Sequence, residues 1–333
     1  MDSDAVALAR KLLPCILSTK FIPLCGHLLG NAPKSDMEPP IVKAYVELMR
    51  PVQWMKNFFI FLPLFFGGRL FDGAVWVQGL LCFAAFSLVA SSVYCLNDIH
   101  DAAADRTHPL KCGRPIASGR VRVKCAWTLC CLLAAAGLAI PWLFIRHDPF
   151  VTFCVIVGYL LMNVAYTFRL KQMPIIDVFV IAFGFVLRLV SGGLSENVPL
   201  SPWIVLLTFL LALFLAFAKR RDDVLRTEES GVVARSSTRS YNREFLNTIL
   251  GIIASVTMVC YIMYTLSPEV IERFHNSYIY VSAVFMLAGM IRYLQIAIVL
   301  RKSGSPTKVL VHDRFVQGCI VMWVLFFLVI IYR

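Results

Sequence analysis

The sequence predicts an all-α integral membrane protein, folded as a nine-transmembrane-helix bundle. Of its 333 residues, 59% are hydrophobic and only 16% are charged. The apolar residues recur in runs of about 18 to 22, the length that crosses the hydrocarbon core of a bilayer as a helix. Segments such as WIVLLTFLLALFLAFA have no polar face, whereas the surface helices of a soluble domain are amphipathic.

Residues 1–42 are predicted to form an N-terminal interfacial or flexible segment and a linker. The stretch KLLPCILSTKFIPLCGHLLG is interrupted by Pro14, Lys20 and Pro23 and is too short to span. NAPKSDMEPP has the proline and polar content of a linker. The opening residues lack the basic start of a signal peptide, so the first span is expected to direct insertion.

Residues 43–333 are predicted to form the nine-helix domain. Each of its candidate spans is an apolar run that ends at a loop richer in charged residues, Pro or Gly. In chain order the nine spans are 57–72, 75–96, 123–145, 149–168, 174–194, 201–218, 245–266, 277–300 and 314–332.

The basic residues predict the topology. Of the 32 Lys and Arg, 26 fall in segments that alternating spans place on one side, and Arg69, Arg146, Arg273 and Arg333 fall on the other. By the positive-inside rule the basic side is cytoplasmic, which predicts an inner-membrane protein with a cytoplasmic N-terminus. The basic residues lie beside spans rather than among exposed aromatics, so we expect no nucleic-acid partner.

An acidic stretch, NDIHDAAAD, follows the second span. Asn97, Asp101 and Asp105 recur every four residues, and Asp98 precedes Asp101 by three, so a helix that continues past Leu96 would put all four on one face. Hard oxygen ligands of this kind suit Mg²⁺ that also binds substrate phosphate. The alternative is a solvated helix end, but polar residues where a span meets the cytoplasm favour a functional site.

Cations accompany this stretch. Arg106, Lys111 and Arg114 follow it directly, and AKRRDDV, which includes Lys219 and Arg220, follows the sixth span. Clustered Arg and Lys typically stabilise phosphates, although any one of them could instead be a topology signal.

One cation lies within a predicted span. Arg188 shares a helical stripe with Gly184 and Gly192, and Asp177 lies about three turns away on nearly the same face. Because a charge in lipid is costly, Arg188 is predicted to face a polar cavity, with Asp177 or a ligand phosphate as its partner. Lys56 either points into that cavity or extends to the headgroups.

These motifs resemble those of the UbiA-type intramembrane prenyltransferase superfamily. NDIHDAAAD has the superfamily's NDxxDxxxD form. LMRPVQWMKN, NDIHDAAADRTHPLKCGRPIASG, LRLVSGG, AKRRDDV, SYN and HDR together resemble the decaprenyl-phosphate phosphoribosyltransferase branch, over about residue 43 to the C-terminus. The resemblance implies a nine-helix bundle with a polar, cytoplasmic-side active site that opens to the bilayer.

One motif departs from the wider superfamily. Members that use prenyl diphosphates carry a second motif of DxxxD form after the sixth helix. Here Arg226 stands four residues after Asp222, and Thr227 stands four after Asp223. The departure favours the phosphoribosyl branch, in which the lipid is the acceptor.

The resemblance implies Mg²⁺-dependent transfer from phosphoribosyl diphosphate to a polyprenyl phosphate, in contact with the membrane bilayer. The predicted ligands of Mg²⁺ and pyrophosphate are Asn97, Asp98, Asp101 and Asp105. The predicted phosphate contacts are Lys111, Arg114, Lys219 and Arg220, followed by Lys56, Arg188 and Tyr241. Asp313 and Arg314 match the family's HDR motif without an assigned role.

Two alternative functions stay open. They are prenyl transfer from a prenyl diphosphate, and a lipid or anion transporter without catalysis. The oligomeric state stays open.

Overall fold

The computed structural model describes residues 41–107, 111–230, 240–300, 309 and 312–332. The chain divides into two units, 1–43 and 44–333. The predicted N-terminal segment therefore lies outside the described residues, apart from Ile41 and Val42. Every described element is a helix, so the all-α prediction is confirmed.

In the described part of the chain, eight helical segments are long and apolar enough to cross a membrane, and they match the last eight of the nine predicted spans. Short helices connect some of them: α5 (Ala102–Thr107), η3 (Leu170–Gln172) and α11 (Pro268–Phe274). The spans are α4 (Gly73–His100), α6 (Val123–Phe144), α7 (Pro149–Phe168), α8 (Ile176–Ser195), α9 (Pro202–Ser230), α10 (Arg243–Leu266), α12 (Ser282–Leu294) with its flanking turns η5 (Ser277–Val281) and η6 (Gln295–Val299), and α14 (Arg314–Tyr332).

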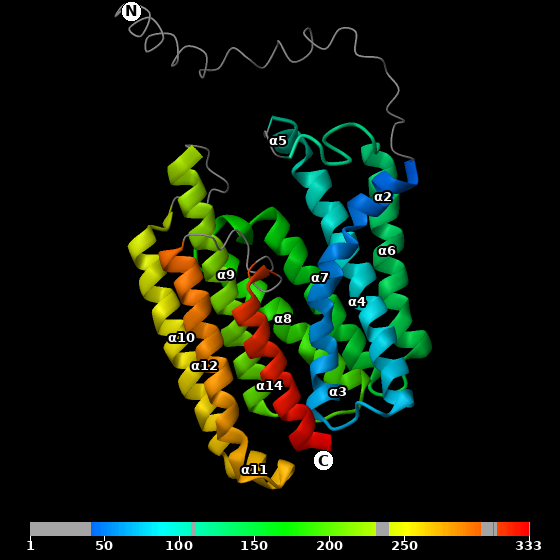
Figure 1. Cartoon of the computed structure of the whole chain (residues 1–333). Helices are drawn as coiled ribbons and strands as arrows, with labels where there is room; N and C mark the ends of the chain where they lie inside the picture. The colour runs from blue at the N-terminus through cyan, green and yellow to red at the C-terminus, as the bar shows by residue number, and fades with distance from the viewer. Residues whose placement is uncertain (1–40, 108–110, 231–239, 301–308, 310–311, 333) are drawn as a thin grey trace, which may run out of the picture. The chain divides into compact units, whose positions relative to one another are not determined.

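The first predicted span is not one α-helix. After α2 (Ile41–Met49), the chain forms a 3₁₀-helix, η2 (Pro51–Phe61), and then α3 (Leu62–Phe66), which together lead from α2 to the far end of the bundle (Figure 1). Arg50 enters η2 with a left-handed backbone, φ 53°. The segment runs very close to α8, because a Cβ on Gly192 would lie 2.0 Å from the carbonyl oxygen of Ile60. Only glycine permits that approach.

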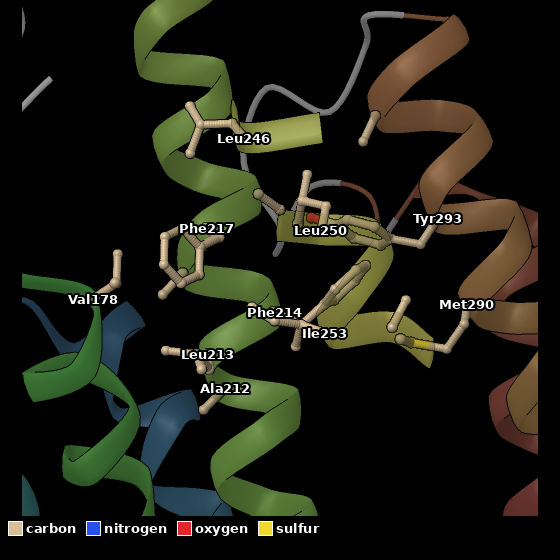
Figure 2. Packing of buried hydrophobic residues seen from close by; sticks show 14 of the residues in the cluster. Val178, Ala212, Leu213, Phe214, Phe217, Leu246, Leu250, Ile253, Met290 and Tyr293 are labelled. Atoms are coloured by element: carbon tan, nitrogen blue, oxygen red, sulfur yellow. The ribbon is translucent and has the colours of Figure 1, made fainter. Parts of the chain in front are cut away.

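The helices of residues 44–333 form two groups joined by α8. In one group α4 packs against α6, α7 and η2, and α4 is the most buried of the spans. In the other α9 packs against α10, and α12 against α14. Figure 2 shows part of the second core, where Phe214, Phe217, Leu250, Ile253 and Tyr293 meet between α9, α10 and α12. α8 contacts both groups, so its side chains reach the interior between them.

Candidate functional site

The acidic motif lies where α4 ends. α4 continues past Leu96, the end of the predicted span, and ends at His100, and α5 begins at Ala102 after a break at Asp101. This break separates Asp105 from the α4 helix. The four polar side chains therefore do not form the single stripe that the spacing predicted, and instead make two pairs with different partners.

Asp98 and Asp105 form the first pair, and one guanidinium connects them. Nη1 of Arg114 lies 3.1 Å from Oδ1 of Asp98 and 2.7 Å from Oδ2 of Asp105. Arg50 donates to the same Asp98 oxygen through Nη2. Asp98 is 2% exposed and Asp105 3%, while the side chains of Arg50 and Arg114 are 28% and 29% exposed. Buried negative charge is thus covered by cations that still reach solvent.

Asn97 and Asp101 form the second pair, directed at the end of α7. The hydroxyl of Thr167 donates to Oδ1 of Asn97 at 2.7 Å. Nζ of Lys171 donates to Oδ1 of Asp101 at 2.7 Å, and Nδ1 of His100 lies 2.8 Å from the same oxygen. Burial raises the pKa of Asp101, but the hydrogen bonds from Lys171 and His100 outweigh it, so the pKa lies below its usual value.

The first pair fits a divalent cation by its chemistry. Among the described residues, no three His, Cys, Asp or Glu side chains are gathered as a ready-made metal site. Asp98 and Asp105 nevertheless converge on one positive group, Nη1 of Arg114, which occupies the place of a cation between them. Mg²⁺ commonly binds one or two carboxylates and completes its coordination with phosphate oxygens and water. The pair offers those carboxylates once the guanidinium moves aside.

The other predicted cations near the motif lie on separate elements. Lys111 is partly buried at the start of the loop that carries Arg114. This loop is braced by Arg120, whose Nη2 donates to the carbonyl of Gly113 at 2.7 Å. Lys56 is partly buried on η2, and Lys219 is exposed on α9.

Arg188 lies inside the bundle and is 5% exposed. Its Nε donates to Oδ1 of Asn57 at 2.7 Å, Nη1 to the carbonyl of Gly184 at 2.6 Å, and Nη2 to the hydroxyl of Tyr159 at 2.9 Å. Asn57 in turn donates to the hydroxyl of Ser87 at 2.9 Å. Arg188 thus has a polar, buried setting, and these three partners among the described residues do not include Asp177.

Asp177 instead belongs to a second charged cluster, with Arg220, Asp223 and Tyr241. Nε of Arg220 donates to Asp177 at 2.7 Å, and its Nη1 donates to Asp223 at 2.9 Å. The hydroxyl of Tyr241 donates to Oδ1 of Asp177 at 3.0 Å. Arg220 is 1% exposed, and burial raises the pKa of Tyr241 to about 12. Arg220 and Tyr241 therefore both bind Asp177, and neither binds Asp98 or Asp105.

A large apolar cavity lies in the second group of helices. It has a volume of about 580 Å³ and is bounded by η2, α3, α9, α10, α11, α12 and α14. Phe59 on η2 lines it, and its ring meets that of Phe185 with centroids 4.9 Å apart. The guanidinium of Arg188 lies 5.6 Å from the centroid of Phe185. The rings of Phe59 and Phe185 thus connect the lining of the cavity to the buried arginine.

Comparison with known proteins agrees with this architecture. Residues 58–318 match the UbiA prenyltransferase family. The chain belongs to that family. Decaprenyl-phosphate phosphoribosyltransferase of Mycobacterium tuberculosis is 30% identical over 293 residues, which cover 86% of this chain and 94% of the relative. The enzyme of the same name from Corynebacterium glutamicum is 29% identical and covers 92% of both chains.

Solved UbiA structures show the same fold. A UbiA homolog from Archaeoglobus fulgidus bound to DMAPP and Mg²⁺ superposes with a TM-score of 0.63 at 22% identity, over 87% of this chain and 99% of that one. At this identity the likeness concerns the fold. The placement of the acidic motif at the end of α4 comes from the present structure.

Several contacts of this UbiA-family site were not predicted from the sequence. Arg50 binds Asp98, Lys171 binds Asp101, and Asn57 and Tyr159 hold Arg188. Arg50 and Asn57 both lie in the quoted motif LMRPVQWMKN, so the motif carried the signal. Asp313 forms an ion pair with Arg292 at 2.8 Å, which gives the acidic residue of HDR a partner.

Proposed function

We propose that this UbiA-family protein transfers the 5-phosphoribosyl group of phosphoribosyl diphosphate to a polyprenyl phosphate and releases pyrophosphate, with Mg²⁺ as cofactor. The buried pair of Asp98 and Asp105, covered by movable cations, is the observation that carries the proposal, because it combines metal ligands with phosphate-binding groups. The near full-length similarity to decaprenyl-phosphate phosphoribosyltransferases supports this donor and acceptor. So does the absence of a DxxxD pairing at Asp222 and Asp223.

The transfer exchanges one bond for another at C1 of the ribosyl group. An oxygen of the lipid phosphate bonds to C1, the bond from C1 to the diphosphate oxygen breaks, and its electron pair leaves with pyrophosphate. The lipid phosphate is already an anion near neutral pH, so no side chain has to remove a proton. When bound at Asp98 and Asp105, Mg²⁺ neutralises charge on the leaving group.

The protein's own cations orient the two anionic substrates. Asp98 and Asp105 would hold the cation in place of Arg114, and Arg114 and Arg50 would then contact the diphosphate. Lys111 and Lys56 lie on adjoining segments and contribute further positive charge. Asn97 and Asp101 complete the polar end of α4 through water or the metal. Catalysis comes from orientation and from fixed charges that match the leaving group.

The proposal also assigns the lipid and the side of the membrane. The chain of the acceptor occupies the apolar cavity that Phe59 lines, with the remainder in the bilayer. The acidic end of α4 faces the cytoplasm of the inner membrane, where the water-soluble donor is available. Lys219, Arg220 and Tyr241 stay predictions as phosphate contacts, and Arg220 and Tyr241 would act by positioning the end of α9.

A membrane-fraction assay tests the proposal. Labelled phosphoribosyl diphosphate is supplied with polyprenyl phosphates of several lengths, with Mg²⁺ or with a chelator. We expect label in the lipid fraction, dependent on both the lipid phosphate and Mg²⁺. Transfer from a prenyl diphosphate with no use of the sugar donor would establish the prenyltransferase alternative. Binding of both substrates without any product would establish a carrier.

A further inference from the structure

Arg188 is a cation deep in the protein that has no negative partner among the residues that the structure describes. It lies 12 residues after the start of α8, roughly 18 Å along the helix axis. Its three hydrogen bonds go to an amide oxygen, a backbone carbonyl and a hydroxyl. None of the carboxylates in the described part of the chain forms an ion pair with it. The bundle thus surrounds this full charge with neutral groups.

The surroundings stabilise the charge only in part. The guanidinium carbon lies 4.7 Å from the ring centroid of Tyr159 and 5.4 Å from that of Phe86, so both rings attract the cation. Arg220 shows what full compensation looks like in this protein, because it is equally buried and has two carboxylate partners. A buried charge without such a partner is costly and commonly marks a binding site.

A second hydrogen-bonding group lies on the neighbouring helix α4. Tyr94 is one turn before Asp98 and packs against the core cluster that contains Tyr159, whose ring lies against Arg188. Arg50, which covers Asp98, lies 5.3 Å from the centroid of the Tyr94 ring. The hydroxyl of Tyr94 makes no hydrogen bond with any described residue. Two N–H groups of Arg188 are also left after its three bonds.

We propose that Arg188 and the hydroxyl of Tyr94 bind a phosphate monoester inside the bundle, at a site separate from the Asp98 and Asp105 pair. A phosphate supplies the missing negative charge and accepts from both groups. Each proposed substrate offers one: the lipid acceptor through its phosphate, and the donor through its 5-phosphate. The identity of the ligand rests on the proposed function, whereas the presence of an anion site rests on Arg188 and Tyr94 alone.

The test measures thermal stability of the purified full-length protein in detergent with added ligands. The probes are farnesyl phosphate, ribose 5-phosphate and inorganic phosphate, and farnesol reports what the lipid chain does without its phosphate. We expect farnesyl phosphate or ribose 5-phosphate to raise the Tm saturably. If farnesyl phosphate acts and farnesol does not, the site holds the acceptor's phosphate. If ribose 5-phosphate acts, it holds the donor's.

Three variants connect that shift to the residues. Tyr94→Phe keeps the ring and should weaken the apparent affinity for the active probe roughly tenfold, as for the loss of one hydrogen bond to a charged group. Arg188→Gln should abolish the shift, and Arg188→Lys should restore part of it. Tyr278→Phe, at a residue that is 67% exposed, is the matched control and should not change it.

The outcomes separate this site from the proposed reaction. An equal Tm shift in the wild type and in Tyr94→Phe would overturn the inference, even if Arg188→Gln fails to fold. So would the absence of a shift with every phosphate. If labelled donor gives no product while the shift persists and depends on Tyr94, the anion site stands and the proposed function fails. Asp98→Asn should lose transfer and keep the shift.

Discussion

The two charged clusters of the bundle differ in which charge they bury. At the end of α4, Asp98 and Asp105 are buried and their cations, Arg50 and Arg114, are more than a quarter exposed. Between the start of α8 and α9, Asp177 and Arg220 are both buried completely. A cation that reaches solvent can be replaced by a metal ion or moved onto a substrate, whereas a fully enclosed pair cannot. Under the proposed function, this difference makes the first cluster the reactive one and the second a structural one.

The largest expected effect is on the enclosed cluster. Asp177→Asn leaves Arg220 buried without its closest carboxylate, which should lower the free energy of unfolding by about 3–5 kcal/mol. The measurement is the thermal midpoint and the folded yield in detergent. Asp223→Asn is the control, because Asp223 is more exposed and Arg220 would keep Asp177. Equal stability of the two variants would contradict the structural role.

The exposed-cation cluster should respond in activity instead. In the proposed reaction Asp98 holds the metal beside the leaving group, so Asp98→Asn should lower transfer about 10²–10³-fold, the range found when one preorganised electrostatic contact is lost. Arg50 stays solvated, and the thermal midpoint should therefore change little. Asp148→Asn makes the same chemical change at an exposed residue in the loop between α6 and α7 and should leave transfer unaltered. Wild-type activity in Asp98→Asn would refute the metal assignment.

Much of this contrast could be predicted from the sequence, and the remainder depends on tertiary contacts. The helical spans follow from apolar run length, and the position of Asp98 and Asp101 follows from spacing on one helix. The partners Arg50 and Lys171 lie 48 and 70 residues away from the aspartates that they bind, so no local pattern indicates them. The pairing of Asp177 with Arg220 likewise requires α8 and α9 to pack together.

The first predicted span shows a different limit. Residues 57–72 have the composition of a span, and run length carries no information about whether the chain turns as an α-helix or a 3₁₀-helix. The close approach of Gly192 to Ile60 and the hydrogen bonds of Asn57 set the actual path. Gly192 lies more than 100 positions after Ile60. Asn57 bonds to Ser87 on α4 and to Arg188 on α8.

Glu196 provides a third case, a buried acid without an ion-pair partner in the described segments. It follows the α8 span, is 2% exposed, and neither of its carboxyl oxygens has a hydrogen-bond partner among the described residues. The backbone of Leu64 lowers the pKa of this carboxyl, but burial outweighs that effect. Burial raises the pKa of Glu196 to about 8. Near neutral pH this carboxyl is therefore protonated in the folded protein and ionised in the unfolded chain.

The sign of the resulting pH dependence follows from that difference. The folded protein binds one more proton than the unfolded chain between about pH 4.3, the ordinary value for Glu, and pH 8. Its stability should therefore fall as the pH rises through this window, by at most about 1.4 kcal/mol per pH unit. Glu196→Gln should flatten the dependence of thermal midpoint on pH, and exposed Glu272→Gln should not. An unchanged slope in Glu196→Gln would show that the carboxyl is ionised.

The smallest expected effect concerns Lys171, whose partner Asp101 is about one third exposed. Lys171→Met should lower the free energy of unfolding by less than about 1 kcal/mol, because solvent screens such pairs. The pKa of Asp101 is depressed in the folded protein, so the pair stabilises the fold above the ordinary Asp value and loses this contribution as the pH falls through the folded pKa. Thermal midpoints of wild type and Lys171→Met should therefore differ at pH 7 and converge in acid.

Lys124→Met is the control, at an exposed lysine without an ion pair among the described residues. It should match wild type at both pH values. A gap that persisted in acid would mean that Lys171 acts through packing of its aliphatic chain and not through Asp101.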